Sequence, residues 1–229
     1  HVTSINHNGT SWCIHFADGA VVKADYVVSG LGGLHEPNFP DIDGLQSFEG
    51  PMFHTAQWRH DVDLKYKRVA IIGSAASAVQ VIPEIVGEVA HLDVYQRTPN
   101  WVMARQSYAY PDWVKSLFEK APWLMRAYRG IYFAMMERRF AAFQKDDNAI
   151  KRSVRKLFTK HLEKQVSDPV LRKKLTPDYP IGCKRILISD DYLAAIQSNN
   201  VDLITEPIEA VTPNGVRTKD GHEHETEDV

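Results

Sequence analysis

Residues 67–96 constrain the fold more than any other part of the sequence. The run KRVAIIG at 67–73 is a charged entry into a continuous apolar stretch, which is typical of a parallel strand covered on both faces. Small residues follow it, then apolar residues at helical spacing from Ala76, and then a second apolar strand at 91–96. Strand, helix and strand in this order predict a β-α-β unit and an α/β fold.

The turn inside this unit has the spacing of a nucleotide-binding loop. Residues 73–78, GSAASA, place small residues where backbone amides and a helix N-terminus could approach a pyrophosphate. Any strand-to-helix turn also favours small residues. The second strand ends in Gln96, Arg97 and Thr98, and a basic residue at this tip suits the 2′-phosphate of NADPH, whereas an NAD site usually has an acid there. The alternative is a surface arginine at a strand end.

Antiparallel meanders are expected at both ends of the chain. Alternating apolar residues and turn dipeptides such as Asn8-Gly9 and Asp18-Gly19 are typical of hairpins. The expected strands lie at 2–5, 11–16, 21–28, 201–204, 208–211 and 216–218. A short helix from Asp190 through Ile196 precedes the second meander.

A helical insertion is expected between these parts, over residues 107–178, where apolar residues recur at helical spacing. This segment has 16 basic and 8 acidic side chains and a net charge of +8, whereas the rest of the chain has −10. Its apolar residues are interpreted as the buried faces of amphipathic helices. It contains no nucleic-acid motif.

The composition excludes several classes of protein. With 44% apolar residues and a net charge of −2, the chain is neither disordered nor basic enough to favour nucleic acid. No apolar run approaches the roughly 18 residues of a membrane-spanning helix. Cys13 and Cys183 lie too far apart for a zinc motif or a disulfide framework, so we expect no metal site and a cytoplasmic location.

Lys184 and Arg185 lie near the start of a strand expected at 181–189. Adjacent side chains of an extended strand point to opposite faces, so the two cations could serve a phosphate and a reacting centre. Arginine stays charged at working pH and can hold an oxygen by directed hydrogen bonds. Most such pairs are only solvated, so this interpretation needs further support.

That support comes from residues 48–58, FEGPMFHTAQW. Here the sequence resembles the Baeyer–Villiger monooxygenases, whose fingerprint is F-x-G-x-x-x-H-x-x-x-W followed by Pro or Asp. Phe48, Gly50, His54 and Trp58 match, and Arg59 departs from the last position. The family's NADPH-binding loop, 2′-phosphate segment and active-site strand are matched at 73–80, 96–101 and 182–185.

The resemblance implies a Rossmann-like NADP-binding domain with a helical insertion, flanked by antiparallel β-meanders that belong to an incomplete FAD domain. We expect this chain to be the central section of a longer enzyme, because the family's N-terminal G-x-G-x-x-G loop is missing from it. The expected parts are 1–47 in the FAD domain, 48–106 as linker and NADP-binding β-α-β unit, 107–178 as helical insertion, 179–198 as return to the NADP domain, and 199–229 in the FAD domain.

The resemblance also assigns roles to residues. Arg185 would be the catalytic arginine, which places the nicotinamide and stabilises negative charge on the oxygenated flavin, and His54 would couple domain movement to catalysis. A structural histidine is the alternative for His54. The expected cofactor-binding residues are Gly73, Ser74, Ser77, Ala78, Gln80, Arg97, Thr98, Lys184, Ser29 and Gly30.

For the whole enzyme the resemblance implies FAD and NADPH as cofactors, and O2 and a ketone as substrates. The product would be an ester or a lactone. Two alternatives stay open: a related flavin monooxygenase that oxygenates nitrogen or sulfur, and a non-catalytic NADPH-binding or interaction module. The sequence does not identify the ketone or the oligomeric state.

Overall fold

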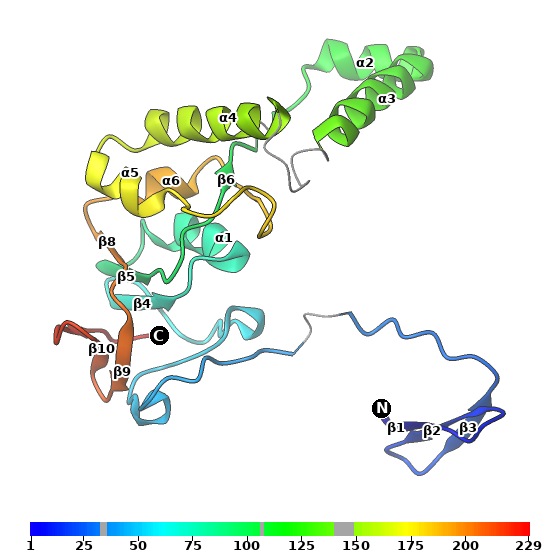
Figure 1. Cartoon of the computed structure of the whole chain (residues 1–229), viewed down its shortest axis with the longest axis horizontal. Coiled ribbons are helices and arrows are strands. Elements are labelled where there is room, and N and C mark those ends of the chain that lie inside the picture. The colour runs from blue at the N-terminus through cyan, green and yellow to red at the C-terminus, as the bar shows by residue number, and fades with distance from the viewer. Residues whose placement is uncertain (33–35, 106–107, 140–148) are drawn as a thin grey trace. The chain divides into compact units, whose positions relative to one another are not determined.

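The computed structural model of the chain describes residues 1–32, 36–105, 108–139 and 149–229. The chain divides into two compact units, His1–Phe39 and Pro40–Val229. The described residues form a mixed α/β fold with a three-stranded parallel sheet, a two-stranded parallel sheet and two antiparallel three-stranded sheets (Figure 1). No helix among the described residues is long and apolar enough to cross a membrane.

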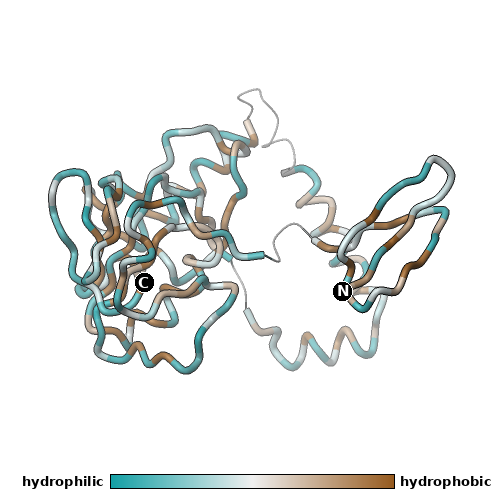
Figure 2. Tube along the Cα trace, turned by 90° about the horizontal axis from the view of Figure 1, so that it is seen from below, coloured by the Kyte–Doolittle hydropathy of each residue, from teal (hydrophilic) through white to brown (hydrophobic). Residues whose placement is uncertain are grey.

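The first unit is the expected N-terminal meander. Strands β1 (Val2–His7), β2 (Trp12–Phe16) and β3 (Val21–Ala24) pair antiparallel in the order β1-β2-β3. Hydrophobic and hydrophilic residues intersperse along them (Figure 2). Gly9 and Gly19 have φ angles of 96° and 85°, which confirms the turns predicted at their dipeptides.

Strand β3 is shorter than the sequence predicted. It was expected to reach residue 28, but it ends at Ala24. Ala24 pairs with Trp12, which is the first residue of β2, so the partner strand ends at this point. Tyr26 and Val28 are therefore left 89% and 93% exposed, despite their β-forming character.

The second unit is built on a parallel sheet. Strands β4 (Arg68–Ile72), β5 (His91–Tyr95) and β8 (Val201–Ile204) pair parallel in the order β4-β5-β8, and helix α1 (Ala76–Ile85) connects the first two. The β-α-β unit is thereby confirmed. The placement of residues 201–204 in the C-terminal meander is wrong, because helix α6 (Tyr192–Ile196) returns the chain to the parallel sheet.

The two faces of this sheet bury different partners. Leu92 and Val94 pack into a core that includes Ile82 of α1, whereas Ala70 and Tyr95 pack into a second core under the C-terminal sheet. The residues alternate between the faces because successive side chains of a strand do so. Helices α1 and α6 lie on one side of the parallel strands, and β9 and β10 lie on the other (Figure 1).

The C-terminal sheet confirms the rest of the second meander. Strands β9 (Ile208–Thr212), β10 (Gly215–Thr218) and β11 (Glu223–Glu225) pair antiparallel in the order β11-β10-β9. Beyond them the chain returns to the free edge of β4, where the amide of Ala70 donates to the carbonyl of Asp228 at 2.8 Å. This edge of the parallel sheet is therefore covered.

The described part of the insertion consists mainly of helices joined by short non-helical segments, and residues 107 and 140–148 lie outside the described ranges. Its helices are α2 (Asp112–Lys120), α3 (Pro122–Arg139), α4 (Ala149–Gln165) and α5 (Pro169–Leu175). The expected burial of its apolar residues holds for Phe158 and Leu162, which are 1% and 3% exposed. It is wrong for α2 and α3, where Trp113 and Ile131 are each 70% exposed, because these helices pack few side chains against the core.

The strand predicted at 181–189 is reduced to two residues. Strand β7 (Leu187–Ile188) pairs parallel with β6 (Val102–Met103). The preceding backbone turns instead: Gly182 has a φ of 97°, and the amide of Cys183 donates to the carbonyl of Pro180 at 3.2 Å. A left-handed glycine and this turn interrupt the extended conformation that the apolar pattern indicated.

Gly50 lies where the segment after 3₁₀-helix η1 (Leu45–Ser47) crosses the C-terminal backbone. A Cβ at this position would lie 2.3 Å from the carbonyl oxygen of Glu227 and 2.7 Å from the ring of Phe48. The neighbouring amide of Glu49 donates to the carbonyl of Pro213 at 3.0 Å, so the crossing is held by main-chain hydrogen bonds. The glycine of the fingerprint is thus required by close packing.

We expect Gly50→Ala to lower the free energy of unfolding by about 1–3 kcal/mol, because the added methyl group overpacks a backbone crossing. Urea unfolding of the purified protein measures this. Gly87→Ala is the matched control: its Cβ meets no atom within 4 Å and its φ is not positive, so we expect an unchanged or slightly raised stability. Equal stabilities of the two variants would contradict the packing argument.

Candidate functional site

Gly73 makes the sharp turn between β4 and α1. Its φ of 113° lies in a region that residues with side chains rarely adopt. The Gly73 amide donates to the carbonyl of Tyr95 at 2.9 Å, which fixes the loop at the end of β5. A Cβ at Gly73 would meet no atom within 4 Å, so the backbone conformation, and not crowding, requires the glycine.

The N-terminus of helix α1 is suited to an anion. Ala75 is the N-cap residue, and no side chain caps the helix. First-turn amides have no partner within a helix, and the helix dipole favours negative charge there. Ser77 is exposed, whereas Ala78 is buried and Gln80 donates through Nε2 to the carbonyl of Ala76 at 3.0 Å. The backbone amides and the Ser77 side chain are the groups that could hold an anion.

The segment after β5 is tied to this loop. The amide Nδ2 of Asn100 donates to the carbonyl of Ser74 at 2.8 Å, and Ser74 Oγ lies 3.5 Å from the carbonyl of Thr98. Ser74 is 7% exposed, so these contacts lie inside the protein. The structure therefore brings Thr98 to the loop from 24 residues along the chain.

Gln96 anchors the chain directly before Arg97. Gln96 is 3% exposed, and its Nε2 donates to the carbonyl of Lys174 at 2.9 Å. Its main-chain amide donates to the carbonyl of Ile204 at 2.8 Å, directly after the end of strand β5. The backbone bends at the next residue, and Arg97 is exposed to solvent.

Tyr179 connects the same segment to the residues that precede β7. Its hydroxyl donates to the carbonyl of Pro99 at 3.0 Å, and its carbonyl accepts from Trp101 Nε1 at 3.3 Å. The Lys184 ammonium lies 4.8 Å from the centroid of the Tyr179 ring, within the range of a cation–π interaction.

Lys184 and Arg185 are both exposed and lie in irregular backbone before β7. The expectation that they occupy a strand and point to its opposite faces is wrong, because the turn at Gly182 precedes them. Lys184 is placed by the Tyr179 ring instead. Arg185 is open to solvent and accessible to a ligand.

The fingerprint segment 48–58 joins the two cores. Phe48 packs against the core under the C-terminal sheet, and Trp58 packs against the core of the helices. Between them, His54 precedes 3₁₀-helix η2 (Thr55–Gln57), and its Nδ1 accepts from the amide of Ala56 at 3.1 Å. His54 is half-buried, and this capping contact places its imidazole at the start of η2.

Arg59, the position that departs from the fingerprint, forms an ion pair with Asp61. This pair lowers the pKa of Asp61, and both side chains are largely exposed. Ser29 and Gly30 belong to the first unit and are exposed. They are not among the residues that the second unit brings together.

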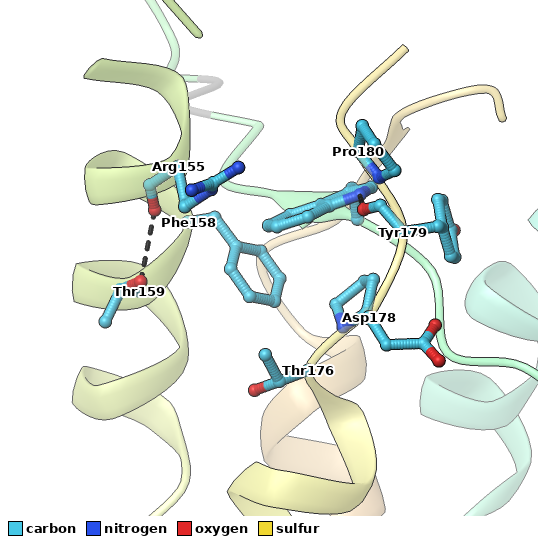
Figure 3. Close-up of a pocket in the computed structure, with 9 residues that line it drawn as sticks. Arg155, Phe158, Thr159, Thr176, Asp178, Tyr179 and Pro180 are labelled. Atoms are coloured by element: carbon cyan, nitrogen blue, oxygen red, sulfur yellow. Dashed lines mark hydrogen bonds between the residues drawn. The ribbon is translucent and has the colours of Figure 1, made fainter. Parts of the chain in front are cut away.

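A pocket of about 390 Å³ opens beside Tyr179. Its walls are helix α4 and the chain from Thr176 to Pro180 (Figure 3). Its lining is aromatic and proline-rich with one guanidinium and one carboxylate, from Trp101, Arg155, Phe158, Thr159, Thr176, Pro177, Asp178, Tyr179 and Pro180. No sequence signal predicted this pocket, because its lining comes from three separate segments, at Trp101, in α4 and at Thr176–Pro180, that meet only in the folded chain.

Comparison with known protein families identifies the chain. A family model described as pyridine nucleotide-disulphide oxidoreductase matches residues 1–129, more than half of the chain. The chain belongs to this family. The matched part includes the N-terminal meander, the fingerprint, the Gly73 loop and the segment 96–101.

Individual relatives of this chain are named monooxygenases, which confirms the resemblance found in the sequence. The chain is 44% identical over 218 residues to a Baeyer-Villiger monooxygenase of Pseudomonas aeruginosa strain PAO1, covering 95% of this chain and 41% of that protein. It superposes on the OTEMO complex with FAD and NADP with a TM-score of 0.80 and 26% identity, covering 100% of this chain and 51% of the other. On oxidized steroid monooxygenase bound to NADP it superposes with a TM-score of 0.80 and 27% identity, again covering 100% of this chain and 51% of the other.

These coverages mean that the chain spans about half the length, or less, of the relatives it matches. The solved structures align with the whole chain, both units included.

A buried acid, Asp93 of β5, lies on the side of the parallel sheet that faces the C-terminal sheet. Asp93 is 1% exposed, and His91 Nε2 lies 3.2 Å from its Oδ1 and 3.3 Å from Oδ2 of Asp202. Burial raises the pKa of Asp93, and the charges of His91, His224 and Arg68 oppose this effect. The sequence predicted no metal site; His91, Asp93 and Asp202 could offer three ligands, and the Arg68 guanidinium lies 4.0 Å from the Asp93 carboxylate.

The sequence missed Tyr179, Asn100 and Asp93 as organising residues. Asp93 could have been found, because an acid inside an otherwise apolar strand is rarely left without a partner. Nothing in the sequence pairs Tyr179 with Pro99 or Asn100 with Ser74, because these contacts form only when the loops fold together.

We expect Asp93→Asn to change how stability depends on pH. A carboxyl whose pKa is raised on folding favours the folded state below its unfolded pKa of about 4, and this contribution is lost as the pH rises through the higher folded pKa. Asparagine does not titrate. The Tm of the variant should therefore rise relative to the Tm of the wild type as the pH increases from 4 to 8. Differential scanning calorimetry across this range measures the difference.

Asp202→Asn is the control for this experiment, since the Asp202 side chain is 70% exposed and contacts the same imidazole. Its Tm difference from wild type should change little with pH. If the Tm difference between Asp93→Asn and wild type also did not change with pH, the role assigned to the burial of Asp93 would be contradicted.

Proposed function

We propose that the protein containing this chain is an FAD- and NADPH-dependent Baeyer–Villiger monooxygenase. It would insert one oxygen atom of O2 next to a ketone carbonyl and give an ester or a lactone. This chain would be its NADPH-binding central part. The name of the Pseudomonas aeruginosa relative and the NADP and FAD bound by the structural neighbours support this proposal.

One observation carries the proposal: three segments that lie far apart in the sequence meet beside the N-terminus of α1. Ser74 contacts the segment of Thr98 and Asn100, and Tyr179 contacts Pro99 and Lys184. Each segment contributes a different group, namely open helix amides, an exposed guanidinium and an ammonium. This combination suits a dinucleotide that carries an additional phosphate.

The described residues fit NADPH by their chemistry. The amides after Gly73 and the hydroxyl of Ser77 would hold the pyrophosphate, because the turn leaves open space at Gly73 and the helix is uncapped. Arg97, Thr98 and Lys184 would bind the 2′-phosphate, where charge-assisted hydrogen bonds are strong. An exposed arginine beside the loop favours NADPH over NADH.

Arg185 is the proposed catalytic residue. When bound, FAD and NADPH supply the redox chemistry and the activation of O2. Arg185 would keep its positive charge at the reacting centre, place the nicotinamide and stabilise negative charge that develops there. Its exposure and its position next to Lys184 support access to the same ligand.

The division into domains follows from the same proposal. The parallel sheet with α1 and α6 would be the Rossmann-like NADP-binding domain, and residues 107–178 would be its helical insertion. The N-terminal and C-terminal antiparallel sheets would belong to the FAD domain, with Ser29 and Gly30 contributing to cofactor binding. His54, between the two cores, would transmit movement of one domain to the other.

We expect Arg97→Ala to raise the KM for NADPH by about 10- to 100-fold, which corresponds to roughly 1.5–3 kcal/mol for charged hydrogen bonds to a phosphate. The KM for NADH should stay unchanged, because NADH has no 2′-phosphate. Steady-state oxidation of both nucleotides by the full-length protein measures the two constants. Arg217→Ala removes an arginine that pairs with Glu209 on the C-terminal sheet, and it should affect neither constant. An equal rise in KM for both nucleotides would contradict the assignment of Arg97 to the 2′-phosphate.

We expect the full-length protein to convert a cyclic ketone to its lactone with consumption of NADPH and O2, and Arg185→Ala to abolish lactone formation. The variant should keep its Tm, since an exposed side chain contributes little to stability. Product analysis with a panel of cyclic ketones, measured together with Tm, tests both expectations.

The panel should also contain an amine and a sulfide. Oxygenation of these compounds alone would replace the proposed reaction with N- or S-oxygenation. Binding of NADPH without flavin or turnover would indicate a non-catalytic module. Lactone formation by Arg185→Ala would remove the proposed role of Arg185 and leave the rest of the proposal standing.

A further inference from the structure

Tyr179 is the residue through which two parts of the candidate site are joined. The hydroxyl at the tip of its side chain donates to the carbonyl of Pro99 at 3.0 Å, and its main-chain carbonyl accepts from Trp101 Nε1 at 3.3 Å. Both partners lie in the segment that directly follows Arg97 and Thr98. Two hydrogen bonds from one residue therefore fix the path of the chain after these side chains.

The state of the hydroxyl suits this arrangement. Burial and the charge of Asp178 raise the pKa of Tyr179, so its hydroxyl keeps its proton and donates at any working pH. The ring is half-buried and packs against the core of the helices, edge to face with Trp101 at 6.5 Å between centroids. In Figure 3, Tyr179 lies on the chain that faces helix α4 across the pocket.

The face of the same ring lies under Lys184. The ammonium is 4.8 Å from the ring centroid, which is within cation–π range. A lysine side chain otherwise has several rotatable bonds and loses rotamer entropy when it is held for binding. Lys184 is exposed and lies in irregular backbone, so the ring is what restricts where its charge resides.

We propose that Tyr179 is a positioning residue that sets the preference for NADPH over NADH, by holding the Lys184 ammonium and the Arg97–Thr98 segment in one fixed arrangement. This inference rests on the proposed function. It adds a determinant that does not itself touch the nucleotide: Tyr179 acts through Lys184 and through the backbone at Pro99. The ring and the hydroxyl have separate effects, and each can be removed alone.

The experiment compares Tyr179→Phe and Tyr179→Leu with wild type in the full-length protein. The measured quantity is the ratio of kcat/KM for NADPH to kcat/KM for NADH. Phenylalanine keeps the ring under Lys184 and loses the hydrogen bond to Pro99, so the ratio should fall about two- to three-fold. Leucine also loses the cation–π contact, so the ratio should fall about ten-fold, mainly through the KM for NADPH.

A double-mutant cycle tests whether Tyr179 acts through Lys184. In a Lys184→Met background, Tyr179→Leu should lower the ratio only about two- to three-fold, because the group that the ring positions is gone and only the hydrogen bond to Pro99 is still lost. The full ten-fold loss in this background would overturn the proposed route. An unchanged ratio for both Tyr179 variants would overturn the inference and leave the proposed function intact.

Phe158→Leu is the matched control. Phe158 lines the same pocket, is 1% exposed and packs edge to face on Trp101 at 4.7 Å, but no cation lies on its ring among the described contacts. It should lower Tm and leave the nucleotide ratio unchanged. A ratio that falls as far in Phe158→Leu as in Tyr179→Leu would show a general loss of packing and overturn the inference.

Two further results are decisive. If Tyr179→Leu does not fold, Tyr179→Phe decides alone: a two- to three-fold fall supports the inference and an unchanged ratio overturns it. If the wild-type protein shows no preference for NADPH, the proposed function fails, and this inference fails with it.

Discussion

Parallel pairing of β4 with β5 is the constraint on which the rest of the second unit depends. It brings the carboxyl ends of both strands to one edge of the sheet, so Gly73 and Gln96 follow at the same place. The amide of Gly73 bonds to Tyr95, and the loop turns into α1 only because Gly73 accepts a positive φ. Every group of the candidate nucleotide site is held relative to this edge.

The sheet can occupy this position because both of its faces are covered. The helices bury one face, and the C-terminal sheet buries the other, where Asp93 is enclosed among His91, Arg68 and His224. A buried carboxylate is costly unless it is paired, so this face keeps its charges in a fixed arrangement. The fingerprint segment links the two cores, which explains why it needs an aromatic residue at each end and a glycine at the crossing.

The sequence predicted the parts of the fold that depend on local chemistry. The β-α-β unit, the two glycine turns of the N-terminal meander and the helices of the insertion were all found, because apolar periodicity and glycine conformations are local. The predictions failed where a partner strand decides the outcome. Strand β3 ends at Ala24 because its partner strand β2 extends no further than Trp12. Strand β8 joins the parallel sheet because helix α6 leads the chain back to the edge of β5.

The same distinction applies to the candidate site. Residue patterns were enough to predict the loop at Gly73, the basic residue at Arg97, the Lys184-Arg185 pair and a family resemblance that the comparisons confirm. The folded chain was needed to show that Gln96 points inward, that Lys184 lies on a ring outside any strand, and that Tyr179 bonds to Pro99. The hydrogen bonds of Gln96 and Tyr179 join residues 78 and 80 positions apart, and no local pattern encodes a hydrogen bond that forms only after the intervening helices have folded.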